Sequence, residues 1–278
     1  MLSAAPTPAQ APQRTRCRQI VEADLDGLAD LLARGFSRSS PDYWRNGFAR
    51  FRALPVIEGV PRYGYVLEAE AGIVGAILLI PSRRGDTIFS NLSSWYVEPA
   101  WRAHSTMLIA MATKLKHVTY VNISPAPHTW KTLQAQGFRQ YSFGRSAIFS
   151  VIGGGVVSEV IPADLPEHNL LADHAAMGCI SLVCKKDGIV SPFVFRRKKL
   201  DRPPLPMAEL IFCRGAGDLR ACAGALGRWL MRRGMAGMIV DGKVSSAFSH
   251  YADGKEPRYF KGPHAPNDLA YTERVIFG

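Results

Sequence analysis

The stretch from residue 88 to residue 125, IFSNLSSWYVEPAWRAHSTMLIAMATKLKHVTYVNISP, constrains the fold most, because strand and helix patterns follow one another within it. Residues 88–97 are rich in β-branched and aromatic side chains, which favours a strand, and Pro99 ends it. Residues 103–116 have apolar side chains at three- and four-residue spacing, which predicts a helix. A second short strand is predicted at residues 119–123. The apolar face of this helix consists of Met107, Leu108, Met111 and Leu115. A helix that begins after a strand offers unpaired N–H groups and a partial positive charge, and both suit a phosphate.

The order V-E-P-A-W-R-A-H-S-T-M-L in residues 97–108 resembles the acyl-CoA-binding segment of the GCN5-related N-acetyltransferases. In that family a strand ending V-x-P is followed by R-x-x-G-x-G/A and a helix. Val97, Pro99 and Arg102 match this pattern, whereas Ser105 and Met107 stand where the family usually has glycines. The resemblance implies that backbone N–H groups of the turn hold the CoA pyrophosphate and that the strand pairs with the pantetheine arm.

The resemblance therefore implies acetyl-CoA or another acyl-CoA as the cofactor. The residues expected to bind it are Ser94, Trp95, Tyr96 and Val97 on the strand, and Arg102, Ala103, His104, Ser105, Thr106 and Met107 on the turn. Serine can still present its N–H and hydroxyl to a phosphate, but methionine would crowd the backbone approach that glycine permits. A variant acyl-CoA pose is then as plausible as an ordinary acetyl-CoA pose.

The elements before this stretch follow the order of the same family. Residues 18–22 predict a strand, residues 24–33 a helix capped by Asp24, and 63–68 with 73–80 a hairpin whose turn contains glycine. A helix that begins at Pro41 carries Tyr43, Trp44, Phe48 and Phe51. In the family this region walls the acceptor site, so these aromatics either line a substrate pocket or pack in the core.

The segment after the stretch also resembles the family but departs from it at one functional position. Residues 128–136 predict a helix that ends at Gly137. The family's closing helix typically ends Y-x-x-x-G-F, and its tyrosine commonly protonates the leaving CoA thiolate. Leu133 occupies that position here. Tyr96, Tyr120 and Tyr141 are the candidates that could replace the missing acid.

The run Gly153-Gly154-Gly155 is the natural domain boundary. It divides a first domain at 15–152, preceded by a disordered tail at 1–14, from a second domain at 156–278. The second domain predicts helices at 166–177 and 218–233, a hairpin at 179–185 and 189–196, and strands at 207–213, 237–240 and 269–277. This order repeats the family's pattern, so the expected fold is α/β (α+β), with a mixed central sheet flanked by helices and a second, degenerate domain of the same kind.

Composition excludes several classes of protein. No apolar run is long enough to span a bilayer, and the five scattered cysteines predict neither a disulfide framework nor a metal site. Cytoplasmic localisation is therefore expected. The net charge of +11 favours an anionic partner or substrate, but no nucleic-acid reader motif accompanies it, so nucleic-acid binding is unlikely.

The candidate catalytic residues are His104, Glu98 and His128, which lie nearest in sequence to the expected thioester. Histidine titrates near neutrality and needs little tuning to act as a base. In the C-terminal half, the loop of residues 259–264 mixes aromatic and basic residues, with Asp268 and Glu273 beyond it. This loop either closes over a substrate or simply connects the last strands.

The sequence predicts an acyl-CoA-dependent N-acyltransferase, most simply an acetyltransferase. A small-molecule or peptide amine would attack the thioester directly, without a covalent enzyme intermediate. One alternative is a degenerate member of the fold kept for binding or as a scaffold, and another is a long-chain acyl or aminoacyl transferase. A homodimer is possible.

Overall fold

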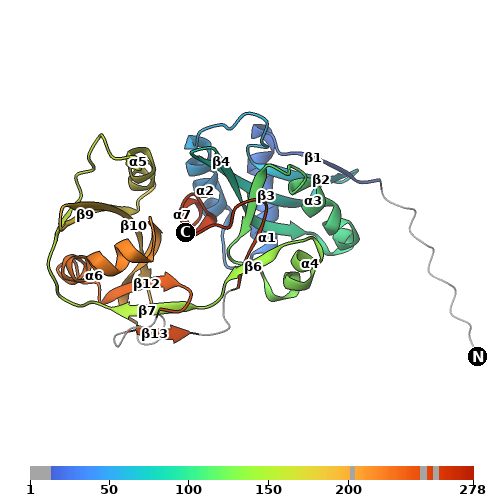
Figure 1. Ribbon diagram of the computed structural model, residues 1–278. Helices are drawn as coiled ribbons and strands as arrows, with labels where there is room; N and C mark the ends of the chain where they lie inside the picture. Colours follow the sequence, from blue (N-terminus) through green and yellow to red (C-terminus); the bar gives the residue numbers. More distant parts are fainter. Residues whose placement is uncertain (1–13, 201–203, 245–248, 253–256) are drawn as a thin grey trace, which may run out of the picture.

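The computed structural model describes residues 14–200, 204–244, 249–252 and 257–278. They form two seven-stranded mixed sheets with helices on both faces of each (Figure 1). This architecture confirms the predicted fold class. Among the described residues, no helix is both long and apolar enough to cross a membrane.

The first sheet has the strand order β1-β2-β3-β4-β5-β14-β6. Its strands are β1 (Arg16–Gln19), β2 (Gly64–Ala69), β3 (Gly72–Arg84), β4 (Thr87–Val97), β5 (Val118–Asn122), β14 (Arg258–Lys261) and β6 (Arg139–Ser142). Its helices are α1 (Leu25–Gly35), α2 (Pro41–Ala53), α3 (Ser105–Ala112) and α4 (Trp130–Ala135), with 3-10 turns η1 (Glu22–Asp24), η2 (Pro99–His104) and η3 (Pro127–Thr129).

Alternate residues of the central strands build two cores, one on each face of the first sheet. Leu78 and Ile80 of β3 pack with the buried faces of α1 and α2. Ile77 and Leu79 point the other way and pack with α3 and α4. This period of two places a helix pair over each face of the sheet.

The second sheet has the equivalent order β13-β7-β12-β11-β10-β9-β8. Its strands are β13 (Ser249–Ala252), β7 (Arg145–Phe149), β12 (Gly237–Asp241), β11 (Pro206–Cys213), β10 (Ile189–Lys199), β9 (Ile180–Lys186) and β8 (Val156–Ser158). The helix α6 (Ala216–Met231) covers one face and α5 (His168–Ala176) covers the other.

The two halves of the chain exchange one strand each. The strand β7 precedes Gly153 but pairs with β12 and β13 of the second sheet, as Figure 1 shows. The strand β14 belongs to the C-terminal half but pairs with β5 and β6 of the first sheet. Residues 15–152 therefore do not contain the whole first sheet, and the expected loop at 259–264 begins with a strand.

The predicted last strand at 269–277 is wrong. Tyr271 has φ +55°, which breaks extended backbone, and the Thr272 hydroxyl donates to the Leu269 carbonyl. The short helix α7 (Glu273–Ile276) follows and lies between the two sheets (Figure 1). An apolar and β-branched run thus forms a short helical turn, because tertiary contacts override its strand propensity.

The predicted helix at 103–116 is shorter than expected. The chain forms η2 over Pro99–His104, and α3 then runs only to Ala112, where Thr113 Oγ1 bonds the Ile109 carbonyl. The predicted end of the following helix is confirmed. Gly137 has φ +84°, and the Phe138 N–H donates to the Leu133 carbonyl at 3.0 Å.

Candidate functional site

The site begins where β4 and β5 separate. These strands pair in parallel from Ile88–Val118 to Asn91–Val121, and in the described chain their pairing ends there. Asn91, only 3% exposed, donates from Nδ2 to the Val121 carbonyl at 3.0 Å. Its Oδ1 accepts the backbone N–H of Glu273 at 2.8 Å. This asparagine therefore ties both strands to α7 at the base of the opening.

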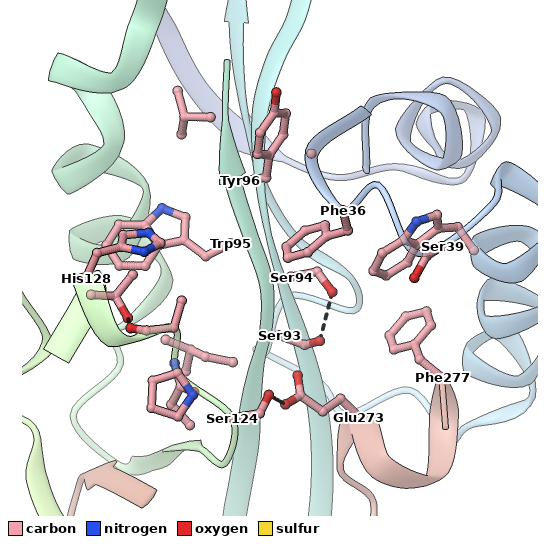
Figure 2. Close-up of a pocket in the computed structure, with 18 of the residues that line it drawn as sticks. Phe36, Ser39, Ser93, Ser94, Trp95, Tyr96, Ser124, His128, Glu273 and Phe277 are labelled. Atoms are coloured by element: carbon pink, nitrogen blue, oxygen red, sulfur yellow. Dashed lines mark hydrogen bonds between the residues drawn. The ribbon is translucent and has the colours of Figure 1, made fainter. Parts of the chain in front are cut away.

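A β-bulge in β4 lies just beyond this point. Ala76 pairs with Tyr96 and Leu78 with Ser93, so Ile77 alone faces the pair Ser94 and Trp95. Ser94 has φ +53°, an uncommon conformation for a residue other than glycine. Beyond the bulge, Trp95 and Tyr96 lie on opposite sides of the strand, as successive strand residues do (Figure 2). Side chains of β4 therefore face both sides of the opening.

The cleft at the opening has a volume of about 920 Å³, which is within the range of ligand pockets. Figure 2 shows Trp95 and His128 on one side of β4, and Phe36, Ser39 and Phe277 on the other. Its lining residues come from α1–α2, β4, α3, β5, α4, β10 and the C-terminal segment. The cleft thus passes through the sheet and offers separate places for two reactants.

The compartment on the Trp95 side combines the start of a helix with an edge of β4. Arg102 and Ser105 line it at the N-terminus of the eight-residue helix α3, and His128, Thr129 and Thr132 line the opposite wall. Beyond Asn91, the described chain provides no strand partner for the edge of β4 that faces this compartment. An anionic group at the helix N-terminus and a hydrogen-bonding arm along the strand edge would satisfy both features.

The predicted cofactor-binding residues fall into two groups. Ser94, Trp95, Tyr96, Val97, Arg102 and Ser105 line the cleft, whereas Ala103, His104, Thr106 and Met107 are not among its lining residues. Met107 packs against the core beneath α3 instead of standing over the turn. Although Met107 stands where the family usually has a glycine, its side chain therefore does not fill the cleft.

The three predicted catalytic residues also separate. His128 lines the cleft. Glu98 is not a lining residue, and it forms an ion pair with Arg34 at 2.9 Å. His104 lies off the cleft as well, with Nδ1 3.4 Å from Thr15 Oγ1. The roles of these three residues in the reaction stay predictions.

The tyrosine candidates for the missing acid differ in access. Leu133 is fully buried in the core. Tyr120 is buried as well, its hydroxyl accepts the Leu115 N–H at 3.2 Å, and burial raises its pKa to about 12. Burial also raises the pKa of Tyr141, well beyond its usual range. Only Tyr96 of the three lines the cleft.

The compartment on the Phe36 side is aromatic. The rings of Phe36 and Trp44 lie 5.5 Å apart, those of Tyr43 and Trp44 5.2 Å, and those of Trp44 and Phe277 5.2 Å. Gly47 permits this cluster, because a Cβ there would lie 2.1 Å from the Phe277 ring. The predicted alternatives therefore divide: Tyr43 and Trp44 line the cleft, while Phe48 and Phe51 pack in the core.

Sequence reasoning missed the contribution of α7 to the cleft of the first sheet. The Glu273 side chain accepts a hydrogen bond from Ser124 Oγ of the segment after β5, and both residues lie near Ser93 at the base of the opening (Figure 2). Burial raises the pKa of the nearby Tyr43, and the Glu273 carboxylate adds to the rise. The only early signal was the presence of Glu273 beyond the aromatic and basic segment.

The second sheet has an equivalent opening, but the chain itself occupies it. The strands β11 and β12 pair in parallel only at Ala208–Met238 and Glu209–Ile239. Beyond that point the Ile211 carbonyl accepts the Leu269 N–H at 2.8 Å. A segment leading to α7 thus takes a hydrogen-bonding position beside β11 that a ligand arm would need.

Two side chains, those of Arg84 and His174, fix this crossing segment, residues 268–272, in place. Asp268 accepts two hydrogen bonds from Arg84 Nη1, both at 2.6 Å, and Arg84 Nη2 donates to the Ala270 carbonyl at 2.8 Å. His174 Nε2 accepts the Tyr271 N–H at 3.2 Å. The crossing segment therefore fills the second opening and sets α7 into the first. Among the described residues, no group of three or more potential metal ligands occurs.

No protein-family model and no curated protein matches the sequence. Solved structures do match. A GCN5-related N-acetyltransferase from Anabaena variabilis ATCC 29413 is similar at a TM-score of 0.62 and 10% identity, over 89% of this chain and 72% of that one. A protein from Pyrococcus horikoshii is similar at a TM-score of 0.58 and 11% identity, over 96% of both chains.

A GCN5-related N-acetyltransferase from Kribbella flavida is similar at a TM-score of 0.52 and 13% identity, over 89% of this chain and 71% of that one. At such identities the likeness bears on the fold alone. The strand order of the first sheet, the opening between β4 and β5 and these matches agree. This chain has the fold of the GCN5-related N-acetyltransferases.

Proposed function

We propose that this protein is an acyl-CoA-dependent N-acyltransferase whose active site is the cleft of the first sheet. The observation that carries the proposal is a single cleft with two compartments on either side of β4, joined at Ser93, Ser124 and Glu273. One compartment suits the CoA thioester and the other suits an amine. Their junction is where an acyl group would pass between them.

The reaction follows from the groups at that junction. The amine nitrogen attacks the thioester carbonyl, so an N–C bond forms and the C–S bond breaks. Glu273 accepts the proton that the amine loses, with Ser124 holding the carboxylate in position. The sulfur leaves as a thiolate and takes a proton from His128, Tyr96 or water. Counted from the neutral amine, the products are an amide and CoA thiol, because the proton lost by the amine balances the one that the thiolate takes up.

Backbone groups of β4 supply the remaining stabilisation. A thioester oxygen that gains negative charge needs a fixed hydrogen-bond donor, and the bulge at Ser94 leaves the backbone of Ser94–Val97 facing the cleft. Acetyl-CoA is the simplest donor, and a longer acyl chain is the variant. Transfer of an acyl group requires only that the amine and the thioester meet across this strand.

The test measures turnover and binding separately. The full chain would be incubated with isotope-labelled acetyl-CoA and mixed amines, and amide mass and free thiol would be followed. Glu273→Gln should lower the rate about 100- to 10,000-fold, as expected for loss of a general base, while acetyl-CoA binding is retained. The control Glu70→Gln, on an exposed hairpin turn, should react like the natural chain.

Two results would overturn the proposal. Binding of acetyl-CoA without amide formation from any amine would favour the alternative of a binding or scaffold protein, for which the loss of the thiolate-protonating tyrosine to Leu133 is the supporting observation. Full activity in Glu273→Gln would remove Glu273 from the mechanism.

A further inference from the structure

We infer that the acceptor is a monoamine with a bulky apolar group, best an aromatic one, and without a second positive charge. This inference rests on the proposed function and names the substrate class of the same site. Three independent features of the Phe36 side of the cleft carry it: its ring surfaces, an unpartnered hydrogen-bond donor and its distribution of charge.

The ring surfaces define the shape of the acceptor. Phe36 and Tyr43 are 36% and 39% exposed, although both line a cleft whose deeper walls are the buried rings of Trp44 and Phe277. Rings placed this way stabilise another aromatic or a branched aliphatic group by burial and by tilted ring contacts. A thin, fully polar amine would leave this surface uncovered.

The unpartnered donor is Trp44 Nε1. This indole lines the cleft, its residue is only 4% exposed, and Nε1 has no hydrogen-bond partner among the described residues. A buried donor without a partner costs about 1–3 kcal/mol, so a substrate oxygen that accepts this bond would be favoured. The best acceptors should therefore carry a carbonyl or hydroxyl oxygen as well as the amine.

The charges limit the acceptor to one ammonium group. Among the described residues that line the cleft, Glu273 has the only acidic side chain. Arg196 and Arg274 also line it, and together with Arg50 they act electrostatically on the Tyr43 hydroxyl. One ammonium can pair with Glu273, but a second would meet guanidinium groups. Polyamines, aminoglycosides and lysine-rich peptides are disfavoured further by the net charge of +11.

The test compares amine acceptors on the full chain with acetyl-CoA, with each rate referred to the concentration of the unprotonated amine. Phenethylamine should have a kcat/KM at least about tenfold above that of ethylamine, in line with the discrimination that apolar pockets achieve. Phenylalaninamide should exceed phenethylamine, and spermidine should be the poorest. A spermidine or lysine-peptide rate above the phenethylamine rate, or equal rates for ethylamine and phenethylamine, would overturn the inference.

Two variants examine the walls. Phe36→Ala should reduce kcat/KM for phenethylamine at least about tenfold more than it reduces kcat/KM for ethylamine. Phe149→Ala is the matched control, since Phe149 is 40% exposed but lies on β7, off the cleft. Trp44→Phe changes a wall of the cleft and should lower kcat/KM for both amines, and it should also remove the advantage of phenylalaninamide over phenethylamine. Equal losses for both amines in Trp44→Phe would contradict the role of Nε1.

Calorimetry of amine binding in the presence of CoA separates this inference from the proposed function. Saturable binding of phenethylamine and none of spermidine, with no amide formed, would support the aromatic site and overturn acyl transfer. Amide formation from spermidine alone would support acyl transfer and overturn the aromatic monoamine.

Discussion

The two sheets share one strand order, but their openings differ. In the first sheet the space between β4 and β5 continues into a cleft of about 920 Å³. In the second sheet the equivalent space beside β11 contains Leu269, which bonds the Ile211 carbonyl. A single segment of chain accounts for both the filled and the open space. Its residues fill the second opening and lead directly to Glu273 in the first.

The difference shows how one half of a duplicated fold can become part of the other's site. Arg84 of the first sheet holds Asp268, and His174 of the second half holds Tyr271. The C-terminal helix α7 is therefore positioned by both halves. The exchange of β7 and β14 makes the two sheets dependent on each other as well.

The largest expected effect comes from cutting the anchor of the crossing segment. Arg84→Ala leaves the buried Asp268 carboxylate without its bidentate partner, and removing one member of a buried ion pair costs about 3–5 kcal/mol. The free energy of unfolding, measured in urea, should fall by that amount. The control Arg34→Ala breaks the exposed pair with Glu98 and should cost less than about 1 kcal/mol. Similar losses for both variants would contradict the anchoring role.

The next effect is a dependence of stability on pH through His174. Burial lowers the pKa of His174 to about 4. The hydrogen bond with the Leu170 carbonyl and the charge of Asp173 raise this pKa, whereas the charge of Arg84 lowers it. The unfolded state then binds a proton between pH 6.5 and 4 that the folded state does not, so stability falls as pH falls through this window. The loss should be about 3 kcal/mol.

Urea unfolding at a series of pH values would measure this loss. In His174→Gln the part of the slope between pH 6.5 and 4 that this residue contributes should disappear. If the slope of stability against pH is unchanged in this variant, the contact between α5 and Tyr271 does not restrict protonation of His174.

A smaller effect is expected at the base of the first opening. Asn91→Ala removes the bonds to Val121 and to the Glu273 N–H and leaves buried groups unpaired, which costs about 1–3 kcal/mol. The turnover should fall too, because Glu273 loses its anchor. Ser90→Ala is the control: this buried hydroxyl has no partner among the described residues, so its loss should be nearly neutral. Equal stability of the two variants would sink this account of Asn91.

The smallest effect is expected at Glu98. This residue is not a cleft-lining residue and pairs with Arg34 at the surface, so Glu98→Gln should change kcat/KM by no more than about twofold, as for ordinary surface substitutions. A steady-state assay would measure it. A loss of 100-fold or more would make Glu98, one of the residues predicted from sequence, the catalytic base in place of Glu273.

Local patterns predicted most of the first sheet. The strand expected at 88–97 is β4 (Thr87–Val97), and the expected hairpin is β2 and β3. These segments have strong alternation or β-branched runs that need no distant information. Arg102 and Ser105, which the family resemblance singled out, line the cleft because they follow β4 closely in sequence, and their binding of a cofactor stays a prediction.

Non-local contacts account for what the sequence did not show. The four residues of β14 are too few for a pattern, and their place between β5 and β6 depends on pairing with distant strands. The run LAYTERVIF has strand propensity, yet Tyr271 and Thr272 turn it into α7. The Phe36 side of the cleft, built from α1–α2 and α7, was therefore only partly predictable.

The central claim is that one opening of two binds acyl-CoA, and calorimetric titration of the full chain with acetyl-CoA tests it most directly. We expect one site per chain. Ser105→Asp, at the first residue of α3, should weaken binding on the order of 100-fold by repelling the ligand's phosphates, whereas Ala216→Asp, at the first residue of α6, should leave it unchanged. Two equivalent sites per chain, or binding lost in Ala216→Asp and kept in Ser105→Asp, would contradict it.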